Sequence, residues 1–305
     1  MKSNPQFEPK DTLQYTKCFG GDANRYVTVV RTALARTASQ SYSFMPLDKF
    51  KSHVCSPNGL ARLNQIYWTE MLHRAHLASC TSLRRNLGWI EAVCMSYAQV
   101  NYLGFSASLR GFVESVGDSA DVLLHMPENI ARDHKMIKRC IDGNEASRAV
   151  AARDMEDELI GYSHARHVHK KEEVPRSHKA KQTQYYVKWL SDFAKLSDLE
   201  KLYKQLCDVM HPAASSVLYQ FVPVLGSDGE VIFKPELEAD RFHIERTLCE
   251  FGNAISRLIC FAFDPGLITL RVLHRFALFA QIPELRKFEF KMSVLADEAN
   301  DLLRK

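Results

Sequence analysis

The chain has 305 residues, of which 46% are hydrophobic, 10% aromatic and 25% charged. These fractions lie close to the averages of globular proteins, so they exclude a chain that is disordered throughout. The formal net charge of +4 is too small to indicate nucleic acid or an anionic membrane as the partner of the whole chain, so any such partner must be recognised by a local patch.

The cysteines and the apolar runs indicate the compartment. Eight cysteines are spread along the chain without a CxxC pair, and most lie within apolar runs such as IEAVCMSY. This pattern is typical of buried, reduced thiols and argues against a zinc ribbon and a disulfide scaffold. The N-terminal residues lack the apolar region of a signal peptide, and no stretch of about 18 uninterrupted apolar residues occurs. We therefore expect a cytoplasmic protein with no membrane partner.

The first half of the sequence reads almost entirely as helix, which the low count of 13 glycines also favours. Residues 1–24 are polar, carry two prolines and predict an N-terminal arm. Apolar residues near a 3.6-residue spacing then predict helices at 25–38, 46–54 and 56–79. A central segment without proline follows at 82–126, and it fits one very long helix or two helices that meet near Gly104.

Small residues follow one face of the central segment. Gly104, Ser108, Gly111 and Ser115 fall at i, i+4, i+7 and i+11, which places them in one strip along a helix. Such a strip lets another helix approach closely. It predicts tight internal packing or the seam of a homodimer.

The second half contains the one convincing strand signal. Helix continues after Pro127, gives way to a polar segment at 163–182 and returns at 185–210. The stretch FVPVLGSDGEVIF, residues 221–233, places two short apolar runs on either side of Gly-Ser-Asp-Gly and predicts a β-hairpin. The closing segments predict helices at 238–262, 265–281 and 283–304.

Together these elements predict an all-α fold, an irregular helical bundle around the long central helix with one inserted β-hairpin. We expect residues 25–305 to form a single helical domain with a continuous core. The polar segment 163–182 fits a loop, a frayed helix or a linker between two halves.

The first candidate site is a polar stripe on the central helix. Its residues fall at i, i+4, i+8, i+11 and i+15, within about one side of a helix. They are Arg110, Glu114, Asp118, Asp121 and His125. Carboxylates and an imidazole on one helix suit a divalent metal, although such sites draw matching ligands from a second helix. The alternative is a solvated face on which Arg110 and Glu114 form an ordinary ion pair.

The second candidate site is the polar segment 163–182, where cations outnumber acids. Its predicted nucleic-acid-binding residues are Arg166, His167, His169, Lys170, Lys171, Arg176, Lys179 and Lys181. The aromatic residues Tyr185, Tyr186 and Trp189 follow directly. Cations that neutralise phosphates beside rings that stack on bases are the combination that single-stranded nucleic acid requires. The alternatives are a solvated surface loop followed by core aromatics, and a less complete metal site at the histidines.

The third candidate site lies in LYKQLCDVMHPAASSVLYQF, residues 202–221. Lys204 and His211 are seven residues apart, so they lie on one face of a helix, two turns from each other. Pro212 cannot continue the helix, which places His211 at its end. Asp208, three residues before the histidine, completes this set. The alternative is a histidine that bonds locally at a helix end.

This spacing of a cation, six residues and a histidine resembles the HEPN domain, an all-helical family whose nuclease members carry Arg, four to six residues and His. The match covers YKQLCDVMHP, which is also similar to segments of bacterial helical proteins linked to defence or toxin systems. The resemblance implies that His211 acts on the attacking 2′-hydroxyl and that Lys204 holds the phosphate, across a dimer and without metal. Lys204 departs from the family, since lysine lacks the planar fork of arginine.

Two functional hypotheses follow. The first is a HEPN-like helical protein that binds RNA or a protein partner in bacterial stress or defence. The second is an enzyme, either a metal-independent ribonuclease that uses His211 and Lys204 or a metal-dependent hydrolase that uses the stripe. The sequence contains no GxGxxG, Walker loop, GxSxG, HExxH or kinase motif set, so no cofactor is expected.

Overall fold

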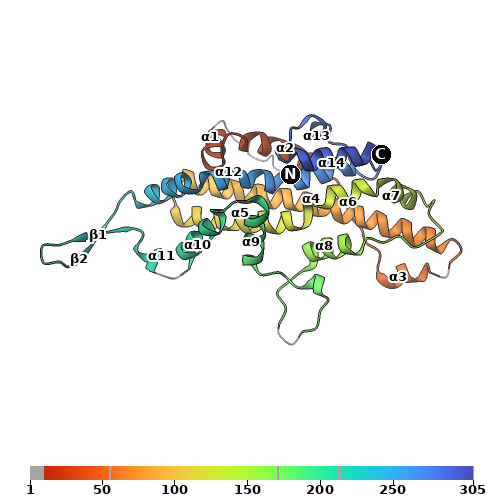
Figure 1. The fold of residues 1–305 in the computed structure, drawn as a ribbon, viewed down its shortest axis with the longest axis horizontal. Coiled ribbons are helices and arrows are strands. Elements are labelled where there is room, and N and C mark those ends of the chain that lie inside the picture. The colour runs from red at the N-terminus through yellow and green to blue at the C-terminus, as the bar shows by residue number, and fades with distance from the viewer. Residues whose placement is uncertain (1–9, 55, 170–171, 212–213, 305) are drawn as a thin grey trace. The chain divides into compact units, whose positions relative to one another are not determined.

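The computed structural model describes residues 10–54, 56–169, 172–211 and 214–304. This part of the chain is predominantly helical and contains one two-stranded antiparallel sheet (Figure 1). In chain order the elements are α1 (Lys10–Phe19), α2 (Ala23–Arg36), α3 (Leu47–Ser52), α4 (Gly59–Ala98), α5 (Tyr102–Leu123), α6 (Met126–Arg132), α7 (His134–Ile141), α8 (Arg153–His164), the 3₁₀ helix η1 (Arg176–His178), α9 (Thr183–Ala194), α10 (Leu199–Met210), α11 (Ala214–Leu218), β1 (Phe221–Leu225), β2 (Val231–Pro235), α12 (Ala239–Leu273), α13 (Glu284–Lys287) and α14 (Ser293–Arg304).

The chain divides into two compact units, each built from three separate stretches. Unit 1 contains residues 1–28, 85–117 and 183–259. Unit 2 contains residues 29–84, 118–182 and 260–305. One boundary between the two units lies between residues 182 and 183. It coincides with the end of the polar segment 163–182, for which a linker was one of the predicted alternatives. The helices α2, α4, α5 and α12 contribute residues to both units.

Part of the predicted N-terminal arm, residues 1–24, is instead a helix packed into the core of unit 1. Tyr15, Cys18 and Phe19 of α1 are buried, and the Phe19 ring meets the edge of Phe112 with ring centroids 5.3 Å apart. These three residues fall at i, i+3 and i+4, which makes an apolar helical face. This apolar face has only three residues and follows a polar stretch. For that reason the sequence pattern predicts an arm here and not a packed helix.

Unit 2 has its own apolar core. Trp68, Met71 and Leu72 of α4 are buried against residues from the end of α5, from α6 to α8 and from the end of α12. Within the core, the Trp68 indole donates a hydrogen bond to the Val150 carbonyl (3.1 Å). The other buried members of this core include Val122, Leu123, Met126, Ile130, Ile137, Cys140, Met155, Leu159, Val272, Leu273 and Phe276.

The predicted break between the helices at 56–79 and 82–126 is wrong, because α4 runs without interruption from Gly59 to Ala98. The polar residues at the expected break fit inside the helix. The hydroxyls of Ser79 and Thr81 each donate to the carbonyl four residues earlier, at 2.8 Å. Bonding of this kind lets serine and threonine sit within a helix without a separate partner.

The central segment does form two helices, and they meet at Val100 and Asn101 just before Gly104. Val100 adopts a left-handed backbone (φ 52°), and the N–H groups of Val100 and Asn101 return to the carbonyls of Tyr97 and Ser96. This is the hydrogen-bond pattern of a Schellman motif, which usually requires glycine. The Asn101 side chain then accepts a hydrogen bond from the Gly104 N–H (2.8 Å) and caps the start of α5.

The predicted break at Pro265 is also wrong, because α12 continues through this proline to Leu273. The predicted helix at 283–304 is instead divided into α13 and α14. The residues between them run through unit 2, where the Asp264 carboxylate accepts a hydrogen bond from the Met292 N–H (2.8 Å). A buried carboxylate that satisfies a backbone donor stabilises this connection where a continued helix was expected.

The strip of small residues is used for packing within unit 1. A Cβ atom on Gly111 would lie 2.6 to 2.8 Å from the ring atoms of Trp89 on α4, so only glycine allows this approach. The Ser115 hydroxyl donates to Asn86 (2.6 Å) and accepts from Arg85 (2.8 Å). These contacts place α5 directly against the end of α4.

Two further predictions concern thiols and membranes. All seven cysteines among the described residues are free, and three of them, Cys18, Cys94 and Cys140, are buried, whereas Cys249 is exposed. None of the helices in the described ranges is both long and apolar enough to span a bilayer.

Candidate nucleic-acid pocket in unit 1

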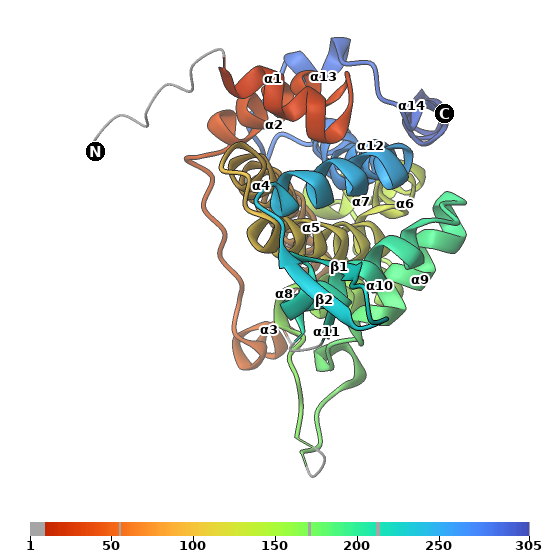
Figure 2. The same ribbon diagram turned by 90° about the vertical axis from the view of Figure 1, so that its left-hand side faces the viewer.

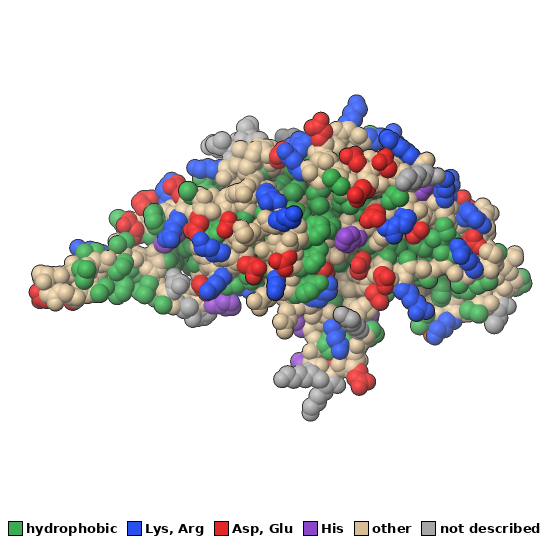
Figure 3. All heavy atoms as spheres, viewed as in Figure 1, with side chains coloured by type: hydrophobic (Ala, Val, Ile, Leu, Met, Phe, Trp, Pro, Cys, Tyr) green, Lys and Arg blue, Asp and Glu red, His purple; other side chains and the backbone are tan. Residues whose placement is uncertain are grey.

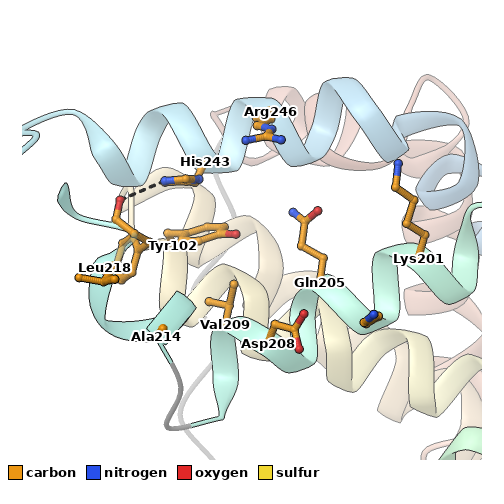
Figure 4. Close-up of a pocket in the computed structure, with 11 residues that line it drawn as sticks. Tyr102, Lys201, Gln205, Asp208, Val209, Ala214, Leu218, His243 and Arg246 are labelled. Carbon is orange, nitrogen blue, oxygen red and sulfur yellow. Dashed lines mark hydrogen bonds between the residues drawn. The ribbon is translucent and has the colours of Figure 1, made fainter. Parts of the chain in front are cut away.

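A pocket of about 610 Å³ lies in unit 1 where α10 and α11 face α12 (Figure 4). Its described lining residues are Tyr102, Lys201, Lys204, Gln205, Asp208, Val209, Ala214, Leu218, Tyr219, His243 and Arg246. A volume of this size is typical of small-ligand sites. The pocket therefore has room for about one nucleotide unit.

The polar face of α10 forms one wall. Lys201, Lys204, Gln205 and Asp208 fall at i, i+3, i+4 and i+7, so they share one side of the helix. The other side carries the buried residues Leu199, Leu202 and Leu206, and the buried Val209 lies at its border and also lines the pocket. Burial of this apolar stripe fixes the rotation of α10 and so turns its polar face toward the pocket.

The wall formed by α12 adds a third cation. Arg246 and His243 lie across the pocket from Gln205 and Asp208 (Figure 4). The Lys201 ammonium pairs with Glu250 (2.6 Å), which raises the pKa of Lys201. Lys204 and Arg246 are exposed and form no ion pair with any described residue. Asp208 is the one carboxylate among the described lining residues, so the pocket carries excess positive charge.

Aromatic rings close the other end of the pocket. The His243 ring stacks on the buried Tyr102, with centroids 5.0 Å apart and planes 21° apart, and Tyr219 lies 5.3 Å from Tyr102. The His243 Nε2 atom lies 3.0 Å from the Tyr219 carbonyl oxygen. Because a carbonyl only accepts hydrogen bonds, Nε2 carries the hydrogen. Asp240 accepts from the Tyr102 N–H (2.8 Å) and holds this end in place.

The pocket contains part of the third predicted site. Lys204 and Asp208 line it, but His211 does not belong to its described lining. His211 is exposed and ends α10 with an extended backbone, and its N–H bonds to the Cys207 carbonyl (2.9 Å). The structure thus brings Lys204 together with Arg246 and His243. The sequence signal for the latter two was their i, i+3 spacing on the polar side of an amphipathic helix.

The first two residues of the predicted stripe form an ion pair in unit 1. The Arg110 guanidinium bonds to Glu114 (2.9 Å), and the Tyr203 hydroxyl donates to the same carboxylate oxygen (2.8 Å). Arg110 also lies over the Tyr203 ring, 5.7 Å from its centroid. Burial and the neighbouring Glu114 raise the pKa of Tyr203, so its hydroxyl stays a donor. Glu114 is therefore already occupied by two protein donors.

The other three stripe residues belong to unit 2. Asp121 pairs with Lys181, Asp118 is half-buried and His125 is exposed directly before α6. Burial, with a smaller contribution from Asp121, raises the pKa of the nearby Glu158 to about 7. Within the described ranges, no group of three or more His, Cys, Asp or Glu side chains is placed to hold a metal ion.

The predicted basic segment 163–182 is a loop that closes on itself after α8. The Arg166 N–H bonds to the His178 carbonyl (3.0 Å), and the Arg166 carbonyl accepts from the Ala180 N–H (3.1 Å). The Arg166 guanidinium forms a two-point ion pair with Glu172, and Lys181 pairs with Asp121. These two cations are therefore neutralised within the chain.

The remaining cations and imidazoles of the segment divide into two groups. His167, His169 and Lys179 are exposed. Lys170, Lys171 and the side chain of Arg176 lie outside the described residues. The aromatics that follow belong to α9 in unit 1, where Tyr185 meets the edge of Tyr186 and Trp189 stacks on Phe193 at 5.4 Å.

Comparisons with protein-family models, curated proteins and solved structures find no match to this chain. Function must therefore be inferred from the chemistry of its pockets and surfaces.

Proposed function

We propose that the protein binds single-stranded RNA in the pocket of unit 1. The observation that carries this proposal is the placement of two unpaired cations, Lys204 and Arg246, on facing helices beside an aromatic cluster. Cations neutralise phosphates and aromatic faces accept bases of any sequence, which is the general chemistry of single-strand binding. The HEPN-like spacing around Lys204 supports the same ligand.

The two ends of the pocket suit the two ends of a nucleotide. Lys201, Lys204 and Arg246 supply donors for phosphate oxygens, although Lys201 is shared with Glu250. At the other end, the half-buried rings of Tyr219 and His243 and the exposed Leu218 offer an apolar surface for a base. Arginine can bind a phosphate through two parallel hydrogen bonds, so Arg246 is the main anchor.

The proposal is for binding, and cleavage is a separate outcome of the same experiment. A ribonuclease of HEPN type requires His211 to reach the phosphate held by Lys204. The imidazole that lines the pocket is His243, and its Nε2–H is committed to the Tyr219 carbonyl. RNA held between Lys204 and Arg246 would therefore remain intact.

The test measures the affinity of a labelled single-stranded RNA by fluorescence anisotropy at several salt concentrations. We expect the double variant Lys204→Ala/Arg246→Ala to bind at least tenfold more weakly. Because each phosphate contact on a single strand contributes about 0.7 to the salt slope, the slope should fall by about 1.4. The matched control is Lys179→Ala, which removes an exposed lysine of the basic segment and should bind normally.

Three outcomes would contradict the proposal. These are wild-type affinity in the double variant, loss of binding in the Lys179→Ala control alone, and chelator-insensitive RNA cleavage that His211→Ala abolishes. The last result would identify the ribonuclease predicted from the HEPN-like spacing. Circular dichroism of each variant separates a lost contact from a lost fold.

A further inference from the structure

Unit 2 contains a second pocket, of about 470 Å³, whose chemistry differs from that of the first. Its described lining residues are Arg271, Val272, His274, Arg275, Gln281, Arg286, Asn300 and Leu303. Three of these eight are arginines, two are neutral amides and none is a carboxylate. No described lining carboxylate offsets the three guanidinium groups, so an anion that binds among them is attracted by all three.

Three elements of unit 2 position the arginines. Arg271 lies in the last turn of α12, and Arg275 lies in the turn that follows it, where its N–H bonds to the Val272 carbonyl (3.0 Å). Arg286 comes from α13, and Asn300 comes from α14. Arg286 donates to Gln281 (3.2 Å), and Gln281 donates to the His274 carbonyl (2.9 Å). This chain of bonds holds the rim of the pocket in place.

The Arg271 side chain is held in place by groups of unit 2. Its guanidinium stacks on the Phe290 ring at 4.7 Å and donates one bond to the Ala296 carbonyl (3.1 Å). Its Nε atom is buried and has no hydrogen-bond partner among the described residues.

The charge of the pocket at neutral pH comes from its arginines. Burial and the neighbouring Arg286 lower the pKa of His274 to about 4, so this imidazole is neutral at pH 7. Burial lowers the pKa of Arg271, while Asp297 and Asp264 oppose that shift. A neutral His274 can donate or accept one hydrogen bond at the pocket wall without adding charge.

We propose that this pocket binds a small molecule that carries a phosphate group. Guanidinium groups match the geometry of phosphate oxygens, and three of them can engage one phosphoryl group from different sides. Gln281 and Asn300 supply neutral donors and acceptors for hydroxyls, while Val272 and Leu303 supply apolar walls. The volume leaves room beyond the phosphate for a sugar-sized group.

Isothermal titration calorimetry on the full chain tests this with four probes at one ionic strength: ribose 5-phosphate, inorganic phosphate, citrate and ribose. We expect both phosphate probes to bind at least tenfold more tightly than citrate, and ribose not to bind. Equal affinity of inorganic phosphate and ribose 5-phosphate would support recognition of the phosphoryl group alone. Equal affinity of citrate, or no heat from either phosphate probe, would overturn the proposal.

The matched variants use exposed arginines so that the fold is preserved. Arg275→Gln/Arg286→Gln should weaken ribose 5-phosphate binding at least tenfold, whereas Arg62→Gln, an exposed arginine of α4 in the same unit, should not change it. The Lys204→Ala/Arg246→Ala variant should also bind the probe normally. Loss of probe binding in that variant alone would assign the phosphate site to unit 1 and refute this one.

A separate observation concerns the β1–β2 hairpin, whose ribbon Figure 2 shows. Its side chains are almost all exposed. Hydrophobic side chains gather over it and acidic ones lie at its tip (Figure 3). The exposed large apolar residues of its strands are Val222, Val224, Leu225, Val231, Ile232 and Phe233. A two-stranded hairpin is marginal on its own, and apolar exposure of this extent marks an interaction surface.

The hydrogen-bond register shows which edge of the hairpin is free. Gly226 bonds to Glu230 and Glu236 bonds to Gln220, so even-numbered residues pair within the hairpin and odd-numbered ones point their backbone groups outward. On β1 the outward residue in the middle is Pro223, which has no N–H. On β2 the outward residues Val231 and Phe233 keep both donor and acceptor.

We infer that a second copy of the chain pairs with the β2 edge. A twofold axis at Ile232 places Val231 opposite Phe233 of the other copy, with four backbone hydrogen bonds. It also places Glu230 opposite the other copy's Lys234, so two pairs of opposite charges meet across the axis. Because an edge contact is smaller than a standard interface of about 1,600 Å², this dimer should dissociate on dilution.

Sedimentation equilibrium from micromolar to millimolar concentration tests the dimer. Lys234→Glu should weaken dimerisation at least tenfold, and the exchanged variant Glu230→Lys/Lys234→Glu should restore it, because the charges again oppose each other. Leu225→Ser, an exposed residue of the far strand that is not paired with Glu230 or Lys234, should have little effect. A wild-type chain that stays monomeric at millimolar concentration, or exchanged charges that do not restore pairing, would refute the inference.

Discussion

A buried histidine in unit 2 makes the stability of the protein depend on pH. His76 is 2% exposed, and its Nδ1 atom lies 2.6 Å from the Tyr42 hydroxyl oxygen. Its ring stacks on Phe279 at 4.4 Å, and His73 and His274 lie close enough to oppose a further positive charge. Burial is the main reason that the pKa of His76 is lowered from 6.5 to about 4.

The size of the effect follows from proton linkage. Between pH 6.5 and pH 4 the unfolded chain binds a proton on this residue and the folded chain does not, so the free energy of unfolding falls as the pH falls. From pH 7 to pH 5, a shift from 6.5 to about 4 corresponds to a loss of about 2 kcal/mol. The loss is complete once the pH is below 4, where both states are protonated.

The assay is urea denaturation at pH 7 and pH 5 for the wild type and for His76→Gln, which keeps a polar group for Tyr42 but cannot titrate. We expect the variant to lose about 2 kcal/mol less than the wild type between the two pH values. The control, His125→Gln, removes an exposed histidine and should behave like the wild type. Equal pH dependence in the wild type and His76→Gln would refute the reasoning.

Two further predictions concern the packing and the turn between α4 and α5, and both are measured by urea denaturation. Gly111→Ala should destabilise the protein by about 1–3 kcal/mol because its Cβ would meet the Trp89 ring, whereas Gly88→Ala, with open space around its Cβ, should stabilise it by up to about 1 kcal/mol. If both changes act alike, the contact with Trp89 is unimportant. Val100→Gly should stabilise by about 1 kcal/mol because φ 52° strains a β-branched residue, and a loss of stability would contradict this.

The sequence predicts most of the elements because their signals are local. The Gly-Ser-Asp-Gly turn between two apolar runs is enough to place β1 and β2, and the polar segment 163–182 is indeed free of long helices. The wrong predictions concern helix boundaries that depend on a side chain far away in the sequence. Asp264 satisfies the Met292 N–H and so helps to divide the last predicted helix, and no pattern near Met292 records this partner.

The candidate site was predicted only where it lies on one helix. Lys204 and Asp208 were identified because α10 alone sets their spacing. Arg246 and His243 were missed, since they come from a helix that begins more than thirty residues later.

The polar lining of the first pocket depends on the apolar packing behind it. The pocket exists because α10 buries Leu202, Leu206 and Val209, while α12 buries Ile244 and Thr247. Each helix can bury that side only by turning its charged side outward, so core packing brings Lys204 and Arg246 into the lining of one pocket. Burial of the apolar sides thus holds both cations at one pocket, and an anion that binds there is attracted by both.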